Sequence, residues 1–277
     1  MSNPTITFIG AGNMAAALIG GLIADGTEPQ AIVATDPDQS RRRSLAQTAG
    51  IQTLADNSEA VTRADIVVLA VKPQILEVVA RDIAEAVQAH RPLVISIAAG
   101  VHSDTLQRWL GGDIALVRSM PNTPAMLQTG ATALFATAAV DDEQRNQAES
   151  VMRAVGLAQW VEDEALMDAV TALSGSGPAY FFLVMEAMET AGVQLGLPAE
   201  SARLLTLQTA LGAARMAIES TDDPATLRQK VTSPGGTTEQ ALRQFEQDGL
   251  RAMFARALTA ARDRSVELSR QLDNPQD

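Results

Sequence analysis

The sequence predicts an α/β fold with a doubly wound, mainly parallel sheet, followed by an all-helical region. Short β-rich runs alternate with helical stretches up to about residue 163. This alternation is typical of a parallel sheet with helices on both faces. Beyond that point convincing strands stop, and the pattern indicates helices separated by proline and glycine. We therefore predict a sheet domain over residues 1–163 and a helical domain over residues 164–277.

The elements of the first domain follow from local patterns. The run Ile66–Ala70 is continuously apolar, which is typical of a strand buried on both faces. Each helix between two strands returns the chain to the start of the next parallel strand. The other predicted strands are Thr5–Ile9, Ile32–Thr35, Leu93–Ile97, Ile114–Arg118 and Ala131–Phe135. The predicted helices are Met14–Asp25, Gln39–Ala49, Asn57–Thr62, Pro73–Ala89 and Ser103–Leu110.

Prolines mark the helix starts of the second domain. Pro178, Pro198 and Pro224 each precede a helical pattern, and proline suits the first turn because the N–H that it lacks has no helical partner there. The helix Pro178–Leu195 is apolar nearly all round, and the helix Ala199–Glu219 is rich in small residues. Such helices bury more than one face. We expect an interlocked homodimer to cover them; the alternative is packing on the first domain.

Composition excludes several classes of function. The chain has 33 acidic and 21 basic residues, a net charge of −12, so we expect no basic surface for nucleic acid. It has no cysteine, which removes disulfides, thiolate nucleophiles and zinc–thiolate sites. We expect no metal site, and the absence of cysteine fits a cytoplasmic protein. No apolar run reaches the ~18–20 residues of a membrane span, and we expect no membrane contact.

A glycine-rich turn follows the first predicted strand and opens the first helix. In a dinucleotide-binding, or Rossmann, fold the first glycine allows the tight turn and the second admits the pyrophosphate. The third small residue lets the helix pack closely on the strand, and the phosphates lie at the helix N-terminus. The sequence therefore predicts a dinucleotide site. Its residues are Gly10, Ala11, Gly12, Asn13, Met14 and Ala15.

Asp36 ends the second predicted strand. An acid at this position commonly accepts hydrogen bonds from the adenosine ribose of NAD and repels the 2′-phosphate of NADP. Arg41, Arg42 and Arg43 follow within seven residues, and an arginine there can bind that phosphate. Alternatively, Asp36 starts a turn and the arginines form a solvated helix face. The residues leave NADP(H) and NAD(H) both open.

Loops after three further strands are predicted to line one groove, because ligands of an open parallel sheet lie beyond the carboxyl ends of its strands. Lys72, the only lysine of this domain, is expected to contact cofactor or substrate; the alternative is a solvated turn. His90 and His102 do not follow such strands and are expected to be surface or capping residues. The groove residues are Ala70, Val71, Lys72, Pro73, Ala98, Ala99, Gly100 and Asn122.

Two strings in the second domain are dense in glycine and hydroxyl groups. Leu173–Tyr180 (LSGSGPAY) leads into the most apolar helix, and Val231–Glu239 (VTSPGGTTE) joins two helices. The second string places hydroxyls and N–H groups at a helix N-terminus, which favours binding of a small carboxylate. The alternative is an ordinary cap with Thr237 or Thr238 as the N-cap residue.

Six motifs occur in the order GAGNMA, AVKP, SIAAGV, MPNTPA, SGSGPAY and VTSPGGTT. With them the chain resembles the pyrroline-5-carboxylate reductase family over essentially its whole length; TSPGGTT before an apolar helix is specific to that family, whereas GAGNMA alone is not. The resemblance implies a Rossmann domain followed by an all-helical dimerisation domain, with dimers often assembled further. It implies NAD(P)H-dependent hydride transfer to the C=N bond of (S)-1-pyrroline-5-carboxylate. The product is L-proline, in the last step of proline biosynthesis.

The resemblance also implies the roles of the site residues. It places Asp36 and Asn57 at the adenosine ribose, although the family often has a small polar residue where Asp36 stands and commonly prefers NADPH. It places the substrate carboxylate in the loop Ser233–Thr238 and the Thr238 hydroxyl near the ring nitrogen. The catalytic residues are then Thr238 and Lys72. The substrate-binding residues are Glu164, Ser176, Ser233, Gly235, Gly236, Thr237 and Thr238.

The predicted chemistry suits the side chains available. The chain has two lysines, two histidines and one tyrosine, and a protonated cyclic imine accepts hydride without a strong general base, so that positioning supplies much of the catalysis. Thr238 is then expected to orient the ring or relay a proton. One alternative is a reductase for another cyclic imine or a β-hydroxyacid. Hydroxyacid enzymes of similar architecture generally place a lysine in the helix corresponding to Pro178–Leu195, which has none. The other alternative is a non-catalytic dinucleotide sensor.

Overall fold

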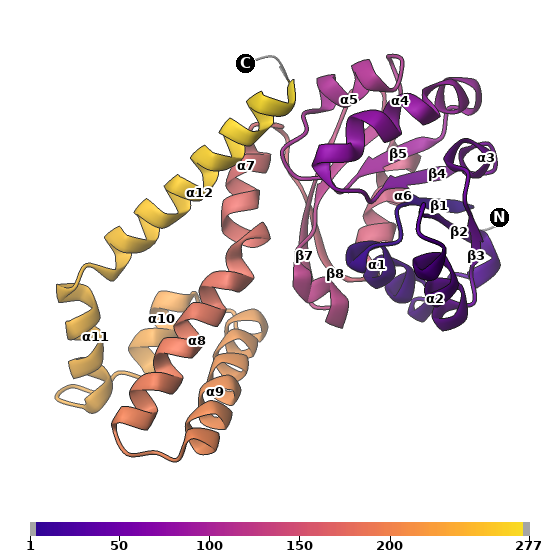
Figure 1. Cartoon of the computed structure of the whole chain (residues 1–277). Coiled ribbons are helices and arrows are strands. Elements are labelled where there is room, and N and C mark those ends of the chain that lie inside the picture. Colours follow the sequence, from indigo (N-terminus) through magenta and orange to yellow (C-terminus); the bar gives the residue numbers. More distant parts are fainter. Residues whose placement is uncertain (1–3, 274–277) are drawn as a thin grey trace. The chain divides into compact units, whose positions relative to one another are not determined.

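The computed structural model describes residues 4–273 (Figure 1). Two compact units make up the chain: the first runs to Ser176 and includes the residues from Ala261 onward, and the second is Gly177–Ala260. The compact units therefore differ from the division predicted at residue 163. Hydrogen bonds of Glu164 with Ser103 and of Ser174 with Asn122 keep the segment after residue 163 with the first unit. The end of the last helix packs there as well, where Leu272 joins a buried cluster.

The first unit contains an eight-stranded sheet in the order β3-β2-β1-β4-β5-β6-β7-β8. Its pairs are parallel except for the antiparallel pair β6–β7, which confirms the predicted, mainly parallel sheet. All six predicted strands are present. The strands are β1 (Ile6–Ile9), β2 (Ile32–Thr35), β3 (Gln52–Leu54), β4 (Ile66–Leu69), β5 (Leu93–Ser96), β6 (Leu116–Met120), β7 (Gly130–Ala136) and β8 (Gly156–Trp160).

Two strands at the edges of the sheet escaped prediction. The strand β3 has three residues and none of them is buried, and β8 buries only Ala158. Neither strand therefore carries the continuous apolar run that marks a central strand. The helix α6 (Asp142–Arg153) was also missed, because it is mostly polar and buries only Ala148, Val151 and Met152.

Helices cover both faces of the sheet, as a doubly wound fold requires. One buried cluster joins the sheet to α1, α2 and α6 through residues such as Leu18, Leu45 and Val151. A second cluster joins the opposite face to α4 and α5 through residues such as Ile83 and Leu106. The helices not yet delimited are α1 (Asn13–Ala24), α2 (Gln39–Ala49), α3 (Asn57–Val61), α4 (Pro73–His90) and α5 (Ser103–Trp109), with short 3-10 turns at Pro29–Ala31 (η1) and Thr123–Leu127 (η2).

The first unit ends in a change of helical geometry. The helix α7 (Leu166–Val170) continues into a π-helical turn, Thr171–Gly175 (η3). The wider turn is closed by the N–H of Ser176, which donates to the carbonyl of Thr171 at 2.8 Å. The end of α12 (Leu250–Asp273) also belongs to this unit, where the Ser265 hydroxyl donates to the Asp168 carboxylate at 2.6 Å.

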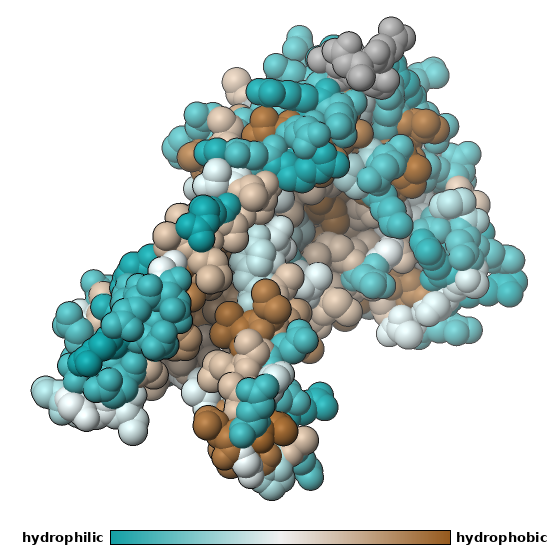
Figure 2. All heavy atoms as spheres, turned by 60° about the vertical axis from the view of Figure 1, so that its left-hand side comes forward, coloured by the Kyte–Doolittle hydropathy of each residue, from teal (hydrophilic) through white to brown (hydrophobic). Residues whose placement is uncertain are grey.

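The second unit consists of helices, as predicted. They are α8 (Gly177–Gln194), α9 (Ala199–Glu219), α10 (Pro224–Lys230), α11 (Thr237–Gln247) and the first part of α12. In the single chain α8 and α9 leave many apolar side chains exposed, among them Phe181, Phe182 and Leu211. The lower part of Figure 2 shows hydrophobic residues at the surface over this unit. No helix within residues 4–273 combines the length and apolarity needed to cross a membrane.

Candidate active site

The glycine turn between β1 and α1 has the shape of a phosphate cradle. Gly10 has φ +104°, and a Cβ there would lie 2.7 Å from the carbonyl oxygen of Ala70, so only glycine fits. A Cβ on Gly12 would meet nothing within 4 Å, so the space in front of this residue is open. Gly12 is also the N-cap of α1, without a side-chain cap. Open space before uncapped N–H groups fits the pyrophosphate of a dinucleotide.

Asp36 lies beside this turn, at the carboxyl end of β2. The residue is 6% exposed, and its carboxylate accepts hydrogen bonds from the N–H groups of Ala11 at 3.1 Å and Asp38 at 2.9 Å. The guanidinium of Arg41 stands 3.8 Å from the same carboxylate, and Arg42 donates to the carbonyl of Asp36. Asp36 therefore does start a turn, and it also ties that turn to the glycine loop. A carboxylate and the exposed arginine Arg41 stand together at this edge.

Asn57 and Lys72 occupy the same edge of the sheet. Asn57 is the first residue of α3. Its side-chain oxygen accepts a hydrogen bond from the Thr35 hydroxyl at 2.6 Å, and its side-chain nitrogen donates to the Asp82 carboxylate at 3.4 Å. Lys72 is the N-cap residue of α4 through its backbone. Its side chain is exposed, and no ion pair holds its ammonium group within residues 4–273. Lys72 is thus free to meet an anionic ligand.

The turn Ile97–His102, between β5 and α5, packs against the end of α12. Gly100 has φ +74°, and a Cβ there would lie 3.6 Å from the Ser269 hydroxyl. The imidazole Nδ1 of His102 lies 2.7 Å from the Asp273 carboxylate, whose other oxygen accepts from the Thr105 hydroxyl at 2.6 Å. His102 is the N-cap residue of α5 but makes no side-chain cap bond. His90 ends α4 and is exposed, as predicted.

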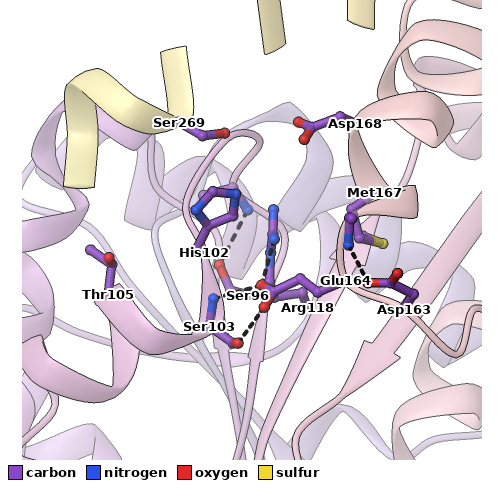
Figure 3. Close-up of polar contacts among 12 residues, drawn as sticks. Ser96, His102, Ser103, Thr105, Arg118, Asp163, Glu164, Met167, Asp168 and Ser269 are labelled. Atoms are coloured by element: carbon purple, nitrogen blue, oxygen red, sulfur yellow. Dashed lines mark hydrogen bonds and ion pairs between the residues drawn. The ribbon is translucent and has the colours of Figure 1, made fainter. Parts of the chain in front are cut away.

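Glu164 forms a compact polar cluster on the other side of this turn. Figure 3 shows its carboxylate between Ser103 and Arg118. It accepts from the Ser103 N–H at 2.6 Å, the Ser103 hydroxyl at 2.6 Å and the Arg118 guanidinium at 2.5 Å. Burial by itself would raise the pKa of Glu164, but the Ser103 hydrogen bonds and the Arg118 charge outweigh it, so that the pKa lies below its ordinary value.

Asn122 is buried and uses both ends of its amide within the chain. Its Nδ2 donates to the carbonyl of Ser174 at 3.0 Å, and its Oδ1 accepts from the N–H of Ala131 at 2.9 Å. Gly175 is the residue after Ser174 in the π-helical turn, and a Cβ on it would clash with the methyl carbon of Met120. The loop after β6 and the turn that leads to Ser176 are therefore packed tightly together.

The loop Ser233–Thr238 of the second unit leaves its hydroxyls available. Gly236 is the N-cap of α11 and makes no side-chain cap. The alternative that Thr237 or Thr238 is the N-cap residue is therefore wrong, because these threonines are the first two residues of the helix. Glu239 accepts instead from the Gly235 N–H at 2.6 Å. In the part of the chain that the structure describes, the hydroxyls of Ser233, Thr237 and Thr238 make no hydrogen bond.

Several residues around the site escaped prediction from sequence. They are Ser103, Arg118, Asp168, Ser265 and Asp273. The Ser103, Arg118 and Glu164 cluster joins residues 46 and 61 positions apart, and no local periodicity reports contacts of that range. One signal was available, since Arg118 is the one charged residue of the strand β6 (LVRSM), and a buried charge requires a partner.

Two family models match the chain. Residues 164–268 match the family described as pyrroline-5-carboxylate reductase dimerisation, and residues 5–100 match NADP oxidoreductase coenzyme F420-dependent. A pyrroline-5-carboxylate reductase of Pseudomonas aeruginosa is 53% identical over 272 residues, covering 98% of this chain and 99% of that protein. The chain belongs to the pyrroline-5-carboxylate reductase family.

Solved structures of this family share the fold. The pyrroline-5-carboxylate reductase of Coxiella burnetii is 49% identical, with a TM-score of 0.94, over 97% of this chain and 99% of that chain. A Plasmodium falciparum pyrroline carboxylate reductase with NADP bound is 28% identical, with a TM-score of 0.85 and the same coverage. The predicted combination of a Rossmann sheet with a helical dimerisation region is thereby confirmed.

Proposed function

We propose that the chain reduces the C=N bond of (S)-1-pyrroline-5-carboxylate with a hydride from NADPH or NADH. The product is L-proline, and the reaction is the last step of proline biosynthesis. The observation that carries the proposal is the match, over 98% of the chain, to a relative named for this activity. The glycine turn supports it, because its open space and uncapped N–H groups suit a dinucleotide.

The carboxyl edge of the sheet forms the cofactor end in this proposal. When bound, the nicotinamide cofactor supplies the hydride. The residues Gly10 to Ala15 hold its pyrophosphate, and Asp36 and Asn57 lie at the adenosine ribose. The segments Ala70–Pro73 and Ala98–Gly100 border the nicotinamide side. Asn122 serves there by fixing the loop after β6, since both ends of its amide are bound within the chain.

The substrate end uses hydroxyl and N–H groups. The loop from Ser233 through Gly235 and Gly236 to Thr237 receives the substrate carboxylate. The Thr238 hydroxyl meets the ring nitrogen, where it orients the ring or relays a proton. Support comes from the position of Thr238 at the start of α11, with no competing hydrogen bond in the described residues. Glu164 and Ser176 act on the substrate side, and the exposed Lys72 ammonium is the second catalytic group.

The proposal includes assembly and location. A homodimer through the helical region is supported by the dimerisation family match and by the apolar side chains that a single chain leaves exposed on α8 and α9. Further assembly of dimers into a larger oligomer follows from the family resemblance. The absence of cysteine from the sequence is compatible with a cytoplasmic enzyme.

The experiment that tests the activity is a comparison of substrates. Oxidation of NADPH and of NADH by the purified protein is followed with pyrroline-5-carboxylate, with a six-membered cyclic imine, with a β-hydroxyacid and with no substrate. We expect turnover with pyrroline-5-carboxylate to exceed every other arm by at least about tenfold, with L-proline as the product. Cofactor binding without turnover of any substrate would favour a dinucleotide sensor, and faster turnover of another substrate would reassign the enzyme.

A further inference from the structure

The turn Ile97–His102 has little backbone support of its own. The N–H of Ile97 donates to the carbonyl of Leu69 at 3.2 Å, and the N–H of Ala98 donates to the Ser96 hydroxyl at 3.4 Å. No hydrogen bond within residues 4–273 engages the N–H groups from Ala99 to Val101. Contacts from elsewhere in the chain must therefore hold this turn in one conformation.

Asp273 contacts the turn at His102, and Glu164 holds its C-terminal end through Ser103. Two hydrogen bonds of 2.6 Å join its carboxylate to Ser103, the first residue of α5, and a charged bond of 2.5 Å joins it to Arg118. Arg118 is 5% exposed and pairs in register with Ser96 across β5 and β6. One carboxylate thus links the end of the turn, the neighbouring strand and the segment that leads into α7. Charge-assisted bonds of this length are short and directional.

The contacts of Glu164 are better suited to fixing the positions of its partners than to stabilising the fold. A buried ion pair contributes little net stability, because desolvation of both charges cancels most of their attraction. Such a pair does fix geometry, since each donor accepts only a narrow range of positions. The carboxylate already receives three donors within the chain, so it acts on the site through the turn that it holds.

We propose that Glu164 is a positioning residue that sets the Ala98–Gly100 edge of the cofactor groove by holding Ser103 and Arg118. This inference rests on the proposed function, in which that edge borders the nicotinamide side. It replaces direct binding of the substrate by Glu164 with an action through the turn. The segment after Glu164 leads through α7 and the π-helical turn to Ser176, so the same contact anchors the substrate side of the first unit.

The test replaces Glu164 by glutamine in the full-length protein and compares it with a matched control. Glu164→Gln keeps the shape of the side chain but removes the charge and one acceptor. The control is Glu149→Gln. The Glu149 carboxylate also accepts hydrogen bonds from an arginine, Arg153 on α6, and from a second donor, Trp160 on β8. We expect kcat/KM for NADPH to fall by about tenfold to a hundredfold in Glu164→Gln, as small misplacements at a reacting centre do, and to stay within about twofold in the control.

A second measurement needs no cofactor. Hydrogen–deuterium exchange of the unliganded protein should show the hydrogen-bonded N–H groups of Ile97, Ala98 and Ser103 exchanging about tenfold faster in Glu164→Gln and unchanged in Glu149→Gln. A role confined to stability would lower the melting temperature without altering kcat/KM in the folded protein or selectively exposing this turn. Unchanged kcat/KM together with unchanged exchange would overturn the proposal.

Ser103→Ala keeps the test decisive if Glu164→Gln does not fold. It removes the hydroxyl, one of the three donors, and we expect a two- to fivefold loss of kcat/KM with faster exchange of the N–H groups of Ile97 and Ala98. Where both variants fold, the double variant should be no worse than Glu164→Gln, because the two residues act through one contact. Additive losses, or a Ser103→Ala variant identical to wild type, would count against the inference. A wild-type protein that does not reduce pyrroline-5-carboxylate refutes the proposed function instead, and the exchange measurement still tests Glu164.

Discussion

The two compact units bury their apolar residues to very different extents. The first unit encloses two continuous clusters, with side chains such as Phe8, Leu18 and Ile83 fully buried. In the second unit, residues 177–260, the only buried residues are Gly177, Ala202 and Thr206. A unit that buries so little has no independent source of stability. The first unit therefore has a closed core of its own, whereas the helices of the second require a further surface, which we assign to a second copy of the chain.

We expect the largest effect from a charge placed on the exposed apolar face of the second unit, because it would separate the two copies of the chain. Phe182 is 64% exposed in the single chain, and burial of each phenylalanine side chain contributes about 1.5–3 kcal/mol. Because a dimer loses two such contacts, Phe182→Glu should raise the dimer dissociation constant by about a hundredfold or more. Analytical ultracentrifugation over a concentration series measures this.

The control for Phe182→Glu lies on the first unit. Leu127 is 80% exposed on η2, and Leu127→Glu should leave the assembly unchanged. A Phe182→Glu variant that sediments like wild type at low concentration would show that the α8 face is not the interface.

A pair of leucine truncations compares the two units directly. Leu18 is fully buried in the first unit, and Leu211 is 62% exposed in the second. Leu18→Ala should cost about 2–5 kcal/mol of unfolding free energy because it leaves a cavity in a closed core. Leu211→Ala should destabilise only through the dimer, so its melting temperature should depend more steeply on protein concentration than that of wild type. Thermal melts at several concentrations separate the two effects, and equal concentration dependence would contradict the contrast.

Thr238 tests the chemistry assigned to the second unit. A hydrogen bond to a charged group contributes roughly 1.5–3 kcal/mol, so Thr238→Ala should lower kcat/KM for pyrroline-5-carboxylate by about ten- to a hundredfold. Cofactor binding should be nearly unaffected. Because Gly236 is the N-cap of α11, the melting temperature should also change little. Thr238→Ser should recover most of the turnover, and full activity of the alanine variant would remove Thr238 from the mechanism.

Asp36 tests the corresponding chemistry in the first unit. Asp36→Ser removes the negative charge that repels a 2′-phosphate, and Arg41, 3.8 Å away, is then free to attract it. We expect the NADPH/NADH ratio of kcat/KM to rise by about five- to tenfold, with the KM for pyrroline-5-carboxylate unchanged. Steady-state kinetics with both cofactors measure the ratio, and a constant ratio would mean that Asp36 acts only in its turn.

The smallest expected effect is a pH dependence of the first unit. The pKa of Glu164 is held below its ordinary value in the fold, so the folded state favours the ionised carboxylate. That stability is fully present above the unfolded pKa, about 4.3, and is lost as the pH falls through the folded value. In Glu164→Gln the unfolding free energy should therefore decline less steeply below about pH 5 than in wild type. Urea unfolding at a series of pH values tests this, and parallel curves would exclude the linkage.

Local pattern was sufficient for much of the fold. The strand β4 is continuously apolar, and β1, β2 and β5 are mostly apolar; all four are buried throughout, as in a sheet covered on both faces. The cradle at Gly10 follows from its place between a strand and a helix. Pattern failed at β3, β8 and α6, because elements at a sheet edge or with a narrow buried stripe need few apolar residues.

The candidate site also has a part that the sequence could predict and a part that it could not. The residues of each loop could be named from sequence, because their spacing relative to strands and helices is local. The partners of Glu164 could not, since Ser103 and Arg118 are distant along the chain and meet it only through the order of β5 and β6 in the sheet. The docking of Asp273 at His102 and Thr105 is likewise a contact across more than 160 residues.

The parallel sheet, the glycine cradle, the helical second half and the family can all be predicted from residue types at fixed short spacings. The division into compact units, the capping of α11 by Gly236 instead of a threonine, and the contact of Glu164 with Ser103 cannot. They depend on burial and on hydrogen-bond partners that are shared between segments far apart in the chain. Such segments meet only when the strands have taken their order and the last helix has returned to the first unit.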